Sequence, residues 1–131
     1  RVIGIDHSPV MVRQASQRLA GAIRLGRVSV RCMAVEEVPA LGLTFDKIYS
    51  ANVTQFFADP VATFQTLYGC LKPGGLIAST HQPRNKGASP KDTARAADKL
   101  SANLLAAGFK GLRREVLDLS PSPAICLIGG A

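Results

Sequence analysis

The chain has 131 residues, of which 47% are hydrophobic, so it is long enough to bury the core of a single domain. It holds no apolar run of membrane-spanning length and no cleavable signal pattern, which argues against a membrane protein and predicts a cytoplasmic one. The net charge of +7 and the pI near 9.8 raise the question of nucleic acid, but the basic residues form no tight cluster and Trp is absent, so that partner is not favoured.

The chain opens with a predicted strand that ends in a carboxylate. Residues 2–5 form the short apolar run typical of a parallel strand covered on both faces. Ser8 can cap the next helix and Pro9 can occupy its first turn, which places Asp6 at the carboxyl end of the strand. Ligands bind at that end of an open α/β sheet, and an acid there can accept two hydrogen bonds from a ribose. Asp6 therefore predicts a nucleoside-containing cofactor; capping of the helix is its alternative role.

Helix and strand patterns alternate over residues 9–82. Apolar residues at helical spacing predict an amphipathic helix from Pro9 to about Leu25, ended by Gly26. The next predicted elements are a strand at 28–33, a loop at 36–39, a strand at 45–51, a helix opened by Asp59-Pro60, a sharp break at 72–75, and a strand at 76–79 that ends near 80–82. Strands joined by helices favour a parallel sheet.

The last third of the chain predicts one more helix and a hairpin. Ser89-Pro90 marks the start of the helix, and Gly108 closes it. Two strands follow, near 112–119 and 124–128, and the Pro-rich link between them is too short for a crossover helix. We therefore expect an α/β fold with a mostly parallel sheet and an antiparallel C-terminal strand.

Three cysteines, Cys32, Cys70 and Cys126, lie far apart in the chain. Without a C-x-x-C pair, neither a zinc site nor a disulfide framework is favoured, and no metal is expected. Buried reduced thiols are the expectation.

Five short segments carry sequence motifs that occur together in one protein family. They are Gly4–Pro9, Glu36–Pro39, Phe45–Ser50, Leu71–Gly75 and Leu104–Phe109. In this order and spacing they resemble the class I S-adenosylmethionine-dependent methyltransferases over essentially the whole chain. The resemblance implies a Rossmann-like three-layer sandwich with S-adenosyl-L-methionine as the cofactor, and the antiparallel last strand separates it from ordinary nicotinamide-binding folds.

The resemblance also assigns roles at the cofactor. It implies that Asp6 binds the ribose hydroxyls and that His7 stacks on the adenine, with a lone exposed histidine as the alternative. Many members place an acid before the Ala-Glu-x-Leu-Pro-like segment to accept from the adenine amine, but here Ala34 stands at that position. The backbone groups of Ala34 and Val35 are then the expected contacts to the adenine edge.

The mouth of the active site is expected after the third and fourth strands. There the resemblance implies that Asn52 and Gln55 orient a substrate or bind the amino-acid part of the cofactor; loop polarity is the alternative explanation of Asn52. His81 is a candidate general base, with a surface histidine as the alternative. Asn52 and His81 are thus the candidate catalytic residues. The sequence lacks an Asn-Pro-Pro-Tyr-type motif there, which disfavours methylation of adenine or glutamine amino groups.

One part of the family pattern has no counterpart. In the family a first strand and its Gly-rich turn lie between the strands that begin here at Val2 and Phe45, so we expect roughly 30 residues or more before Arg1. Residues 1–131 are accordingly predicted to be a single, incomplete domain that lacks the first strand and the Gly-rich turn. Upstream residues, or a homo-oligomer, are expected to cover the strand edges left unpaired. Alone, the 131 residues should bind the cofactor poorly, and tight stoichiometric binding in isothermal titration would refute this.

Four functions remain open. Methyl transfer to a small molecule is the first, because a single domain leaves no room for a separate substrate module. Methylation of RNA or protein is suggested by the basic charge, and a degenerate, non-catalytic methyltransferase-like module by Ala34 and the missing Gly-rich turn. Nicotinamide-dependent oxidoreduction is the fourth, since Asp6 would serve equally well at its ribose.

Overall fold

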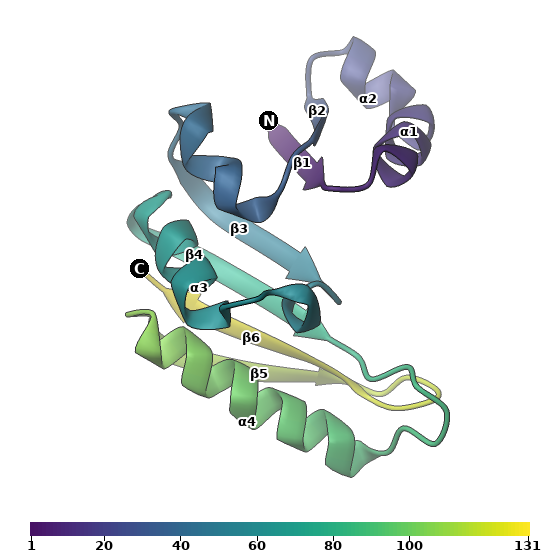
Figure 1. The fold of residues 1–131 in the computed structure, drawn as a ribbon, viewed down its shortest axis with the longest axis vertical. Coiled ribbons are helices and arrows are strands. Elements are labelled where there is room, and N and C mark those ends of the chain that lie inside the picture. Colours follow the sequence, from purple (N-terminus) through teal and green to yellow (C-terminus); the bar gives the residue numbers. More distant parts are fainter. The chain divides into compact units, whose positions relative to one another are not determined.

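The structure is a computed structural model that describes all 131 residues. The chain divides into two compact parts, Arg1–Leu41 and Gly42–Ala131, and each is described by itself (Figure 1). The first holds a two-stranded sheet and the second a four-stranded sheet. None of the helices is both long and apolar enough to cross a lipid bilayer.

The first part is a strand-helix-strand unit. Its two strands run parallel, as predicted. Ser8 caps the first helix by accepting a hydrogen bond from the N–H of Met11, and Pro9 occupies the first turn. The elements are β1 (Val2–Asp6), α1 (Pro9–Arg18), α2 (Ala20–Arg24), β2 (Val28–Cys32) and the 3-10 helix η1 (Val35–Leu41).

Three predictions for this part are wrong in detail. No residue of β1 is buried, because the strand pairs with β2 alone in this sheet. The helix expected over 9–25 is interrupted at Leu19, whose ψ of 12° leaves the helical range, and Gly21 lowers the helix propensity just beyond it. The segment 36–39, expected to be a loop, lies in η1, where Val38 is buried.

The second part is a sheet in which one strand is reversed. The strand order is β3-β4-β6-β5; β3 and β4 are parallel, and β6 runs antiparallel to both of its neighbours. This confirms the predicted C-terminal hairpin. The elements are β3 (Phe45–Ala51), the 3-10 helix η2 (Thr54–Phe56), α3 (Pro60–Gly69), β4 (Leu71–His81), α4 (Pro90–Ala106), β5 (Lys110–Leu117) and β6 (Ala124–Gly130).

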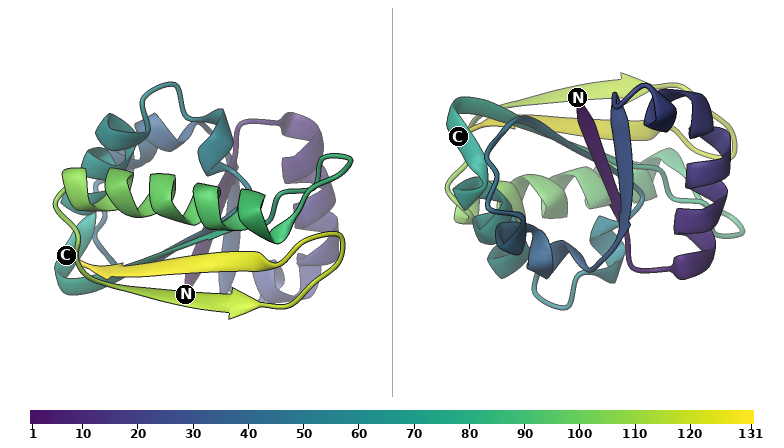
Figure 2. Two further views of the ribbon diagram at one scale, coloured as in Figure 1. Left: turned by 90° about the horizontal axis from the view of Figure 1, so that it is seen from below. Right: turned by 90° about the horizontal axis from the view of Figure 1, so that it is seen from above.

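The core of the second part lies between this sheet and its two helices. Figure 2 shows α3 and α4 against the same face of the sheet. Phe64 of α3, Leu104 of α4 and Leu127 of β6 are each 0% exposed. Two of the three predicted layers are therefore present within this part.

The ends of the helices follow the sequence signals. Asp59 caps α3 by accepting from the N–H of Ala62, and Gly108, with a φ of +105°, ends α4. The carboxylate of Asp92 accepts from both the N–H and the hydroxyl of Ser89 at the start of α4, and these bonds lower the pKa of Asp92.

One boundary in this part differs from the prediction. The segment 72–75 was expected to break the preceding helix, with the fourth strand starting at Leu76, but α3 ends at Gly69 and β4 already begins at Leu71, which pairs with Phe45. The register then shifts, so 72–75 forms an irregularity within the strand. Gly75 is needed there, since a Cβ would lie 2.9 Å from the carbonyl oxygen of Lys72.

The three cysteines and the strand edges were also the subject of predictions. All three thiols are free, but the expectation that they are buried is wrong for Cys32, which is exposed; Cys70 is buried and Cys126 is half-buried. Strand β1 pairs on one side only, and β3 ends the order of its own sheet. That another strand or a second copy covers these edges stays a prediction.

Candidate functional site

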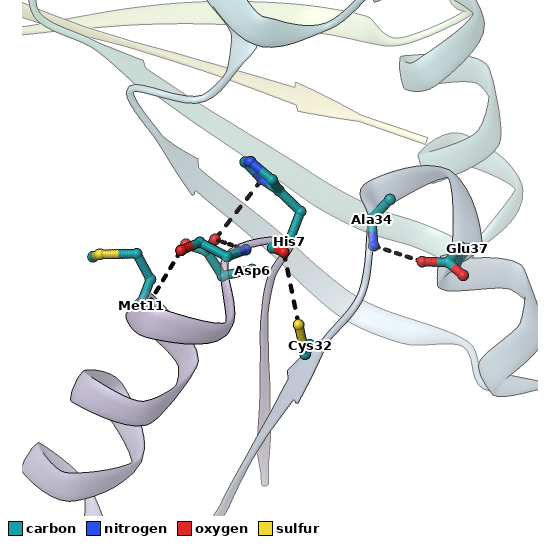
Figure 3. A network of polar contacts seen from close by, with 7 residues as sticks. Asp6, His7, Met11, Cys32, Ala34 and Glu37 are labelled. Carbon is teal, nitrogen blue, oxygen red and sulfur yellow. Dashed lines mark hydrogen bonds and ion pairs between the residues drawn. The ribbon is translucent and has the colours of Figure 1, made fainter.

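The carboxyl end of β1 presents Asp6 and His7 (Figure 3). Asp6 Oδ1 accepts a hydrogen bond from the N–H of Ser8 at 2.8 Å, and no hydrogen bond engages its Oδ2. The Asp6 side chain is 40% exposed and that of His7 is 82% exposed. Asp6 therefore holds the turn into α1 with one oxygen, and its other oxygen has no partner. That it binds a ribose stays a prediction.

Ala34 and Glu37 form a closed turn after β2 (Figure 3). The N–H of Ala34 donates to Glu37 Oε2 at 2.7 Å, and the carbonyl of Ala34 accepts from the N–H of Glu37. Both backbone groups of Ala34 are thus engaged, while Val35 opens η1, where a first N–H has no partner inside the helix. Of the two predicted adenine contacts, Ala34 already has partners for both of its backbone groups, and the contact through Val35 stays a prediction. An acid three residues after Ala34 was the signal for this turn.

Asn52 joins the ends of β3 and β4. Its N–H donates to the carbonyl of Thr80 at 2.9 Å, and its Oδ1 accepts from the N–H of Gln82 at 2.8 Å. Its φ of +53° lies in the left-handed region, which asparagine tolerates better than most residues. The predicted site residue therefore has a structural task, and only its Nδ2 is left to meet a ligand.

A hollow of about 470 Å³ opens at these strand ends. Sequence reasoning placed Asn52, Gln55 and His81 here, but missed other residues that follow the carboxyl ends of the strands. The residues of its lining that bear on chemistry are Asn52, Gln55, Phe56, His81, Gln82 and Arg84.

His81 is the titratable group best placed for chemistry in this hollow. It is half-buried, not a freely exposed surface histidine, and its Nδ1 is buried without a hydrogen-bond partner. Burial lowers the pKa of His81 below its usual 6.5. The imidazole is consequently neutral at pH 7 and able to accept a proton.

The task of Asn52 at the strand ends leads to a prediction on stability. We expect Asn52→Ala to lower the free energy of unfolding by about 2 kcal/mol, because it removes the bond to Gln82 and puts alanine at a positive φ. Asn52→Asp keeps an acceptor oxygen and tolerates this φ, so it should cost less than half as much. Urea denaturation measures both variants, and equal stability of the two would contradict this account.

Comparison with known proteins assigns the family. Residues 1–79 match the family described as methyltransferase domain. The uncharacterized methyltransferase YdaC of Bacillus subtilis is 32% identical over 124 residues, covering 94% of this chain and 66% of that protein. The ubiquinone/menaquinone biosynthesis C-methyltransferase UbiE of Geotalea daltonii is 30% identical over 76 residues, covering 58% of this chain and 32% of that protein. The chain thus spans about two thirds of one relative and about a third of the other.

The fold has a match among solved structures. The N-methyltransferase NodS of Bradyrhizobium japonicum, crystallised with S-adenosyl-L-homocysteine, superposes with a TM-score of 0.75 at 16% identity, covering 99% of this chain and 66% of that one. This likeness concerns the fold alone and agrees with the α/β topology of the two parts. Sequence match and fold together show that the chain belongs to the methyltransferase-domain family, with the Rossmann-like fold of class I S-adenosylmethionine-dependent methyltransferases.

Proposed function

We propose that the protein transfers a methyl group from S-adenosyl-L-methionine to a small molecule. The observation that carries the proposal is Asp6, a carboxylate with an unengaged oxygen at the carboxyl end of a parallel strand. In a chain of this family, that position suits the ribose hydroxyls of the cofactor.

The residues around Asp6 fit a nucleoside. His7 offers an exposed ring for stacking against the adenine, and the N–H of Val35 is available to its edge. When bound, the cofactor supplies an activated methyl group on its sulfonium, so the protein has to position the acceptor and remove a proton.

The hollow at the ends of β3 and β4 is the proposed acceptor site. A neutral His81 in its lining can take the proton from an O–H or N–H group of the acceptor as the methyl group is transferred. Asn52 supports this role by fixing the chain after β3 to the chain after β4.

A small acceptor is favoured over RNA or protein. The hollow is of small-molecule size, and the ubiquinone/menaquinone methyltransferase among the relatives is named for biosynthesis of small molecules. Three free thiols suit a reducing compartment, so the cytoplasm is the proposed location.

The test is methyl transfer by the full-length protein. With cofactor labelled in its methyl group, we expect label to enter members of a panel of small metabolites, and not RNA or protein. Asp6→Ala should lower the rate of transfer at subsaturating cofactor, because it weakens binding of S-adenosyl-L-methionine. Cofactor binding without transfer to any panel member would favour a non-catalytic methyltransferase-like module. Label in RNA or protein would favour an RNA or protein methyltransferase.

A further inference from the structure

We infer that the acceptor is a small anion: a compound with a carboxylate on an apolar, planar body, whose charge is read by Arg84. This inference rests on the proposed function, because it concerns the same hollow. It deepens that function by naming the substrate class. Three features of the hollow support it: the charge of its lining, the unpaired Arg84 side chain, and the anchored backbone that carries it.

The lining of the hollow carries one permanent charge, and it is positive. Arg84 contributes a guanidinium, no Asp or Glu lines the hollow, and the other polar groups are amides and His81. The sequence around it has the same bias, since no acid occurs between Asp59 and Asp92, whereas this stretch holds Lys72, Arg84, Lys86 and Lys91. An anionic ligand therefore meets attraction here and no opposing carboxylate.

The Arg84 guanidinium has no partner of its own. The five ion pairs of the structure engage other cations, and no hydrogen bond holds this side chain. Most of the acids that could compete are already occupied: Asp59 caps α3, and Asp92 holds Ser89 and Arg95. A planar fork of unengaged N–H donors is the group that matches a carboxylate.

The backbone that carries Arg84 is anchored. The carbonyl of Pro83 accepts from the buried hydroxyl of Ser122 at 2.6 Å. The side chain of Gln82 donates to the carbonyls of Ser120 and Ser122. The segment between His81 and Arg84 is thus tied to the link between β5 and β6, which fixes the backbone next to both of these lining residues.

The remaining lining favours an apolar body next to the charge. Phe56 lines the hollow, and this residue is 75% exposed. Its ring is therefore open to a ligand. A ring of this kind stacks on planar ligands. An acceptor with an aromatic or similarly flat body and one carboxylate uses Phe56 and Arg84 together, and leaves His81 for the group that is methylated.

The experiment compares matched pairs of ligands. Aromatic carboxylates and their primary amides, such as 4-hydroxybenzoate and 4-hydroxybenzamide, are titrated by NMR into full-length protein saturated with S-adenosyl-L-homocysteine. We expect the acids to bind at least about fivefold more tightly than the amides, and this difference in affinity should shrink as the salt concentration is raised. Arg84→Gln should remove that preference and leave amide binding unchanged, whereas Lys86→Gln, which removes the same charge from the same loop outside the hollow, should keep it.

The outcomes separate this inference from the function on which it rests. Equal binding of acids and amides, absence of acid binding, or a preference that survives Arg84→Gln would overturn the inference. Binding of S-adenosyl-L-homocysteine is measured independently by calorimetry. If S-adenosyl-L-homocysteine binds and the protein does not prefer acids to amides, only the substrate class is wrong. If S-adenosyl-L-homocysteine fails to bind while binding of the acids still depends on Arg84, the hollow takes anions but the methyltransferase proposal is wrong.

Discussion

Asp6→Ala is expected to weaken binding of S-adenosyl-L-methionine to the full-length protein by about 100-fold. The reason is that two charge-assisted hydrogen bonds to the ribose disappear together. Asp6→Asn should cost only about tenfold, because its Oδ1 can still accept from Ser8 and keep the turn into α1. Calorimetric titration measures both changes.

The control for this experiment is Asp46→Asn. Asp46 also lies in a strand and carries the same charge, but it sits near the amino end of β3. There the Lys72 ammonium donates a hydrogen bond to Asp46 Oδ1 at 2.8 Å and holds the pKa of that carboxyl below its usual range. Affinity of the Asp46→Asn variant should stay within about twofold of the wild type, since an exposed ion pair contributes little. An Asp6→Ala variant that binds as tightly as the Asp46→Asn control would remove the basis of the proposed function.

His81→Gln is expected to slow methyl transfer by about 100-fold at pH 7, with cofactor affinity unchanged, because the proton acceptor in the hollow is lost. In the wild type the base must be unprotonated, so the rate should rise with pH and level off above the pKa of His81. Burial lowers that pKa, which puts the inflection below 6.5. Stopped-time assays with labelled cofactor across this pH range measure the profile.

The second histidine provides the matched comparison. His7→Gln leaves His81 in place, so its profile should keep the inflection even if cofactor binding weakens through the lost ring. The His81→Gln profile should be flat over the same range. If His81→Gln keeps the inflection, or His7→Gln loses it, the titrating base is another group and His81 has a structural part only.

Local signals predicted most of the fold. The caps at Ser8 and Asp59 and the turn at Gly108 depend on residues close in sequence, and these boundaries hold in the structure. The reversed strand β6 was predictable because the link before it is too short for a crossover. Burial of β1 was not, since it depends on how many neighbours the strand has. The same holds for the early start of β4, which is set by pairing of Leu71 with Phe45.

The position of a candidate residue was predictable where it depends on one strand end, as for Asp6 at the end of β1. It was not predictable where a role depends on partners distant in sequence. The hydrogen bond between Asn52 and Gln82 joins residues 30 positions apart, and no sequence pattern around Asn52 predicts its positive φ. The sequence did not distinguish Arg84 from the other basic residues, because only the folded chain shows that its side chain has no partner and that no carboxylate lines the hollow.

The account depends most on the carboxylate at the end of β1, and a crystal structure of the full-length protein with S-adenosyl-L-homocysteine tests it most directly. The account predicts both ribose hydroxyls within hydrogen-bond distance of the Asp6 carboxylate, with Oδ1 still accepting from Ser8. A nucleoside bound elsewhere, with Asp6 facing only solvent and its own turn, would contradict it.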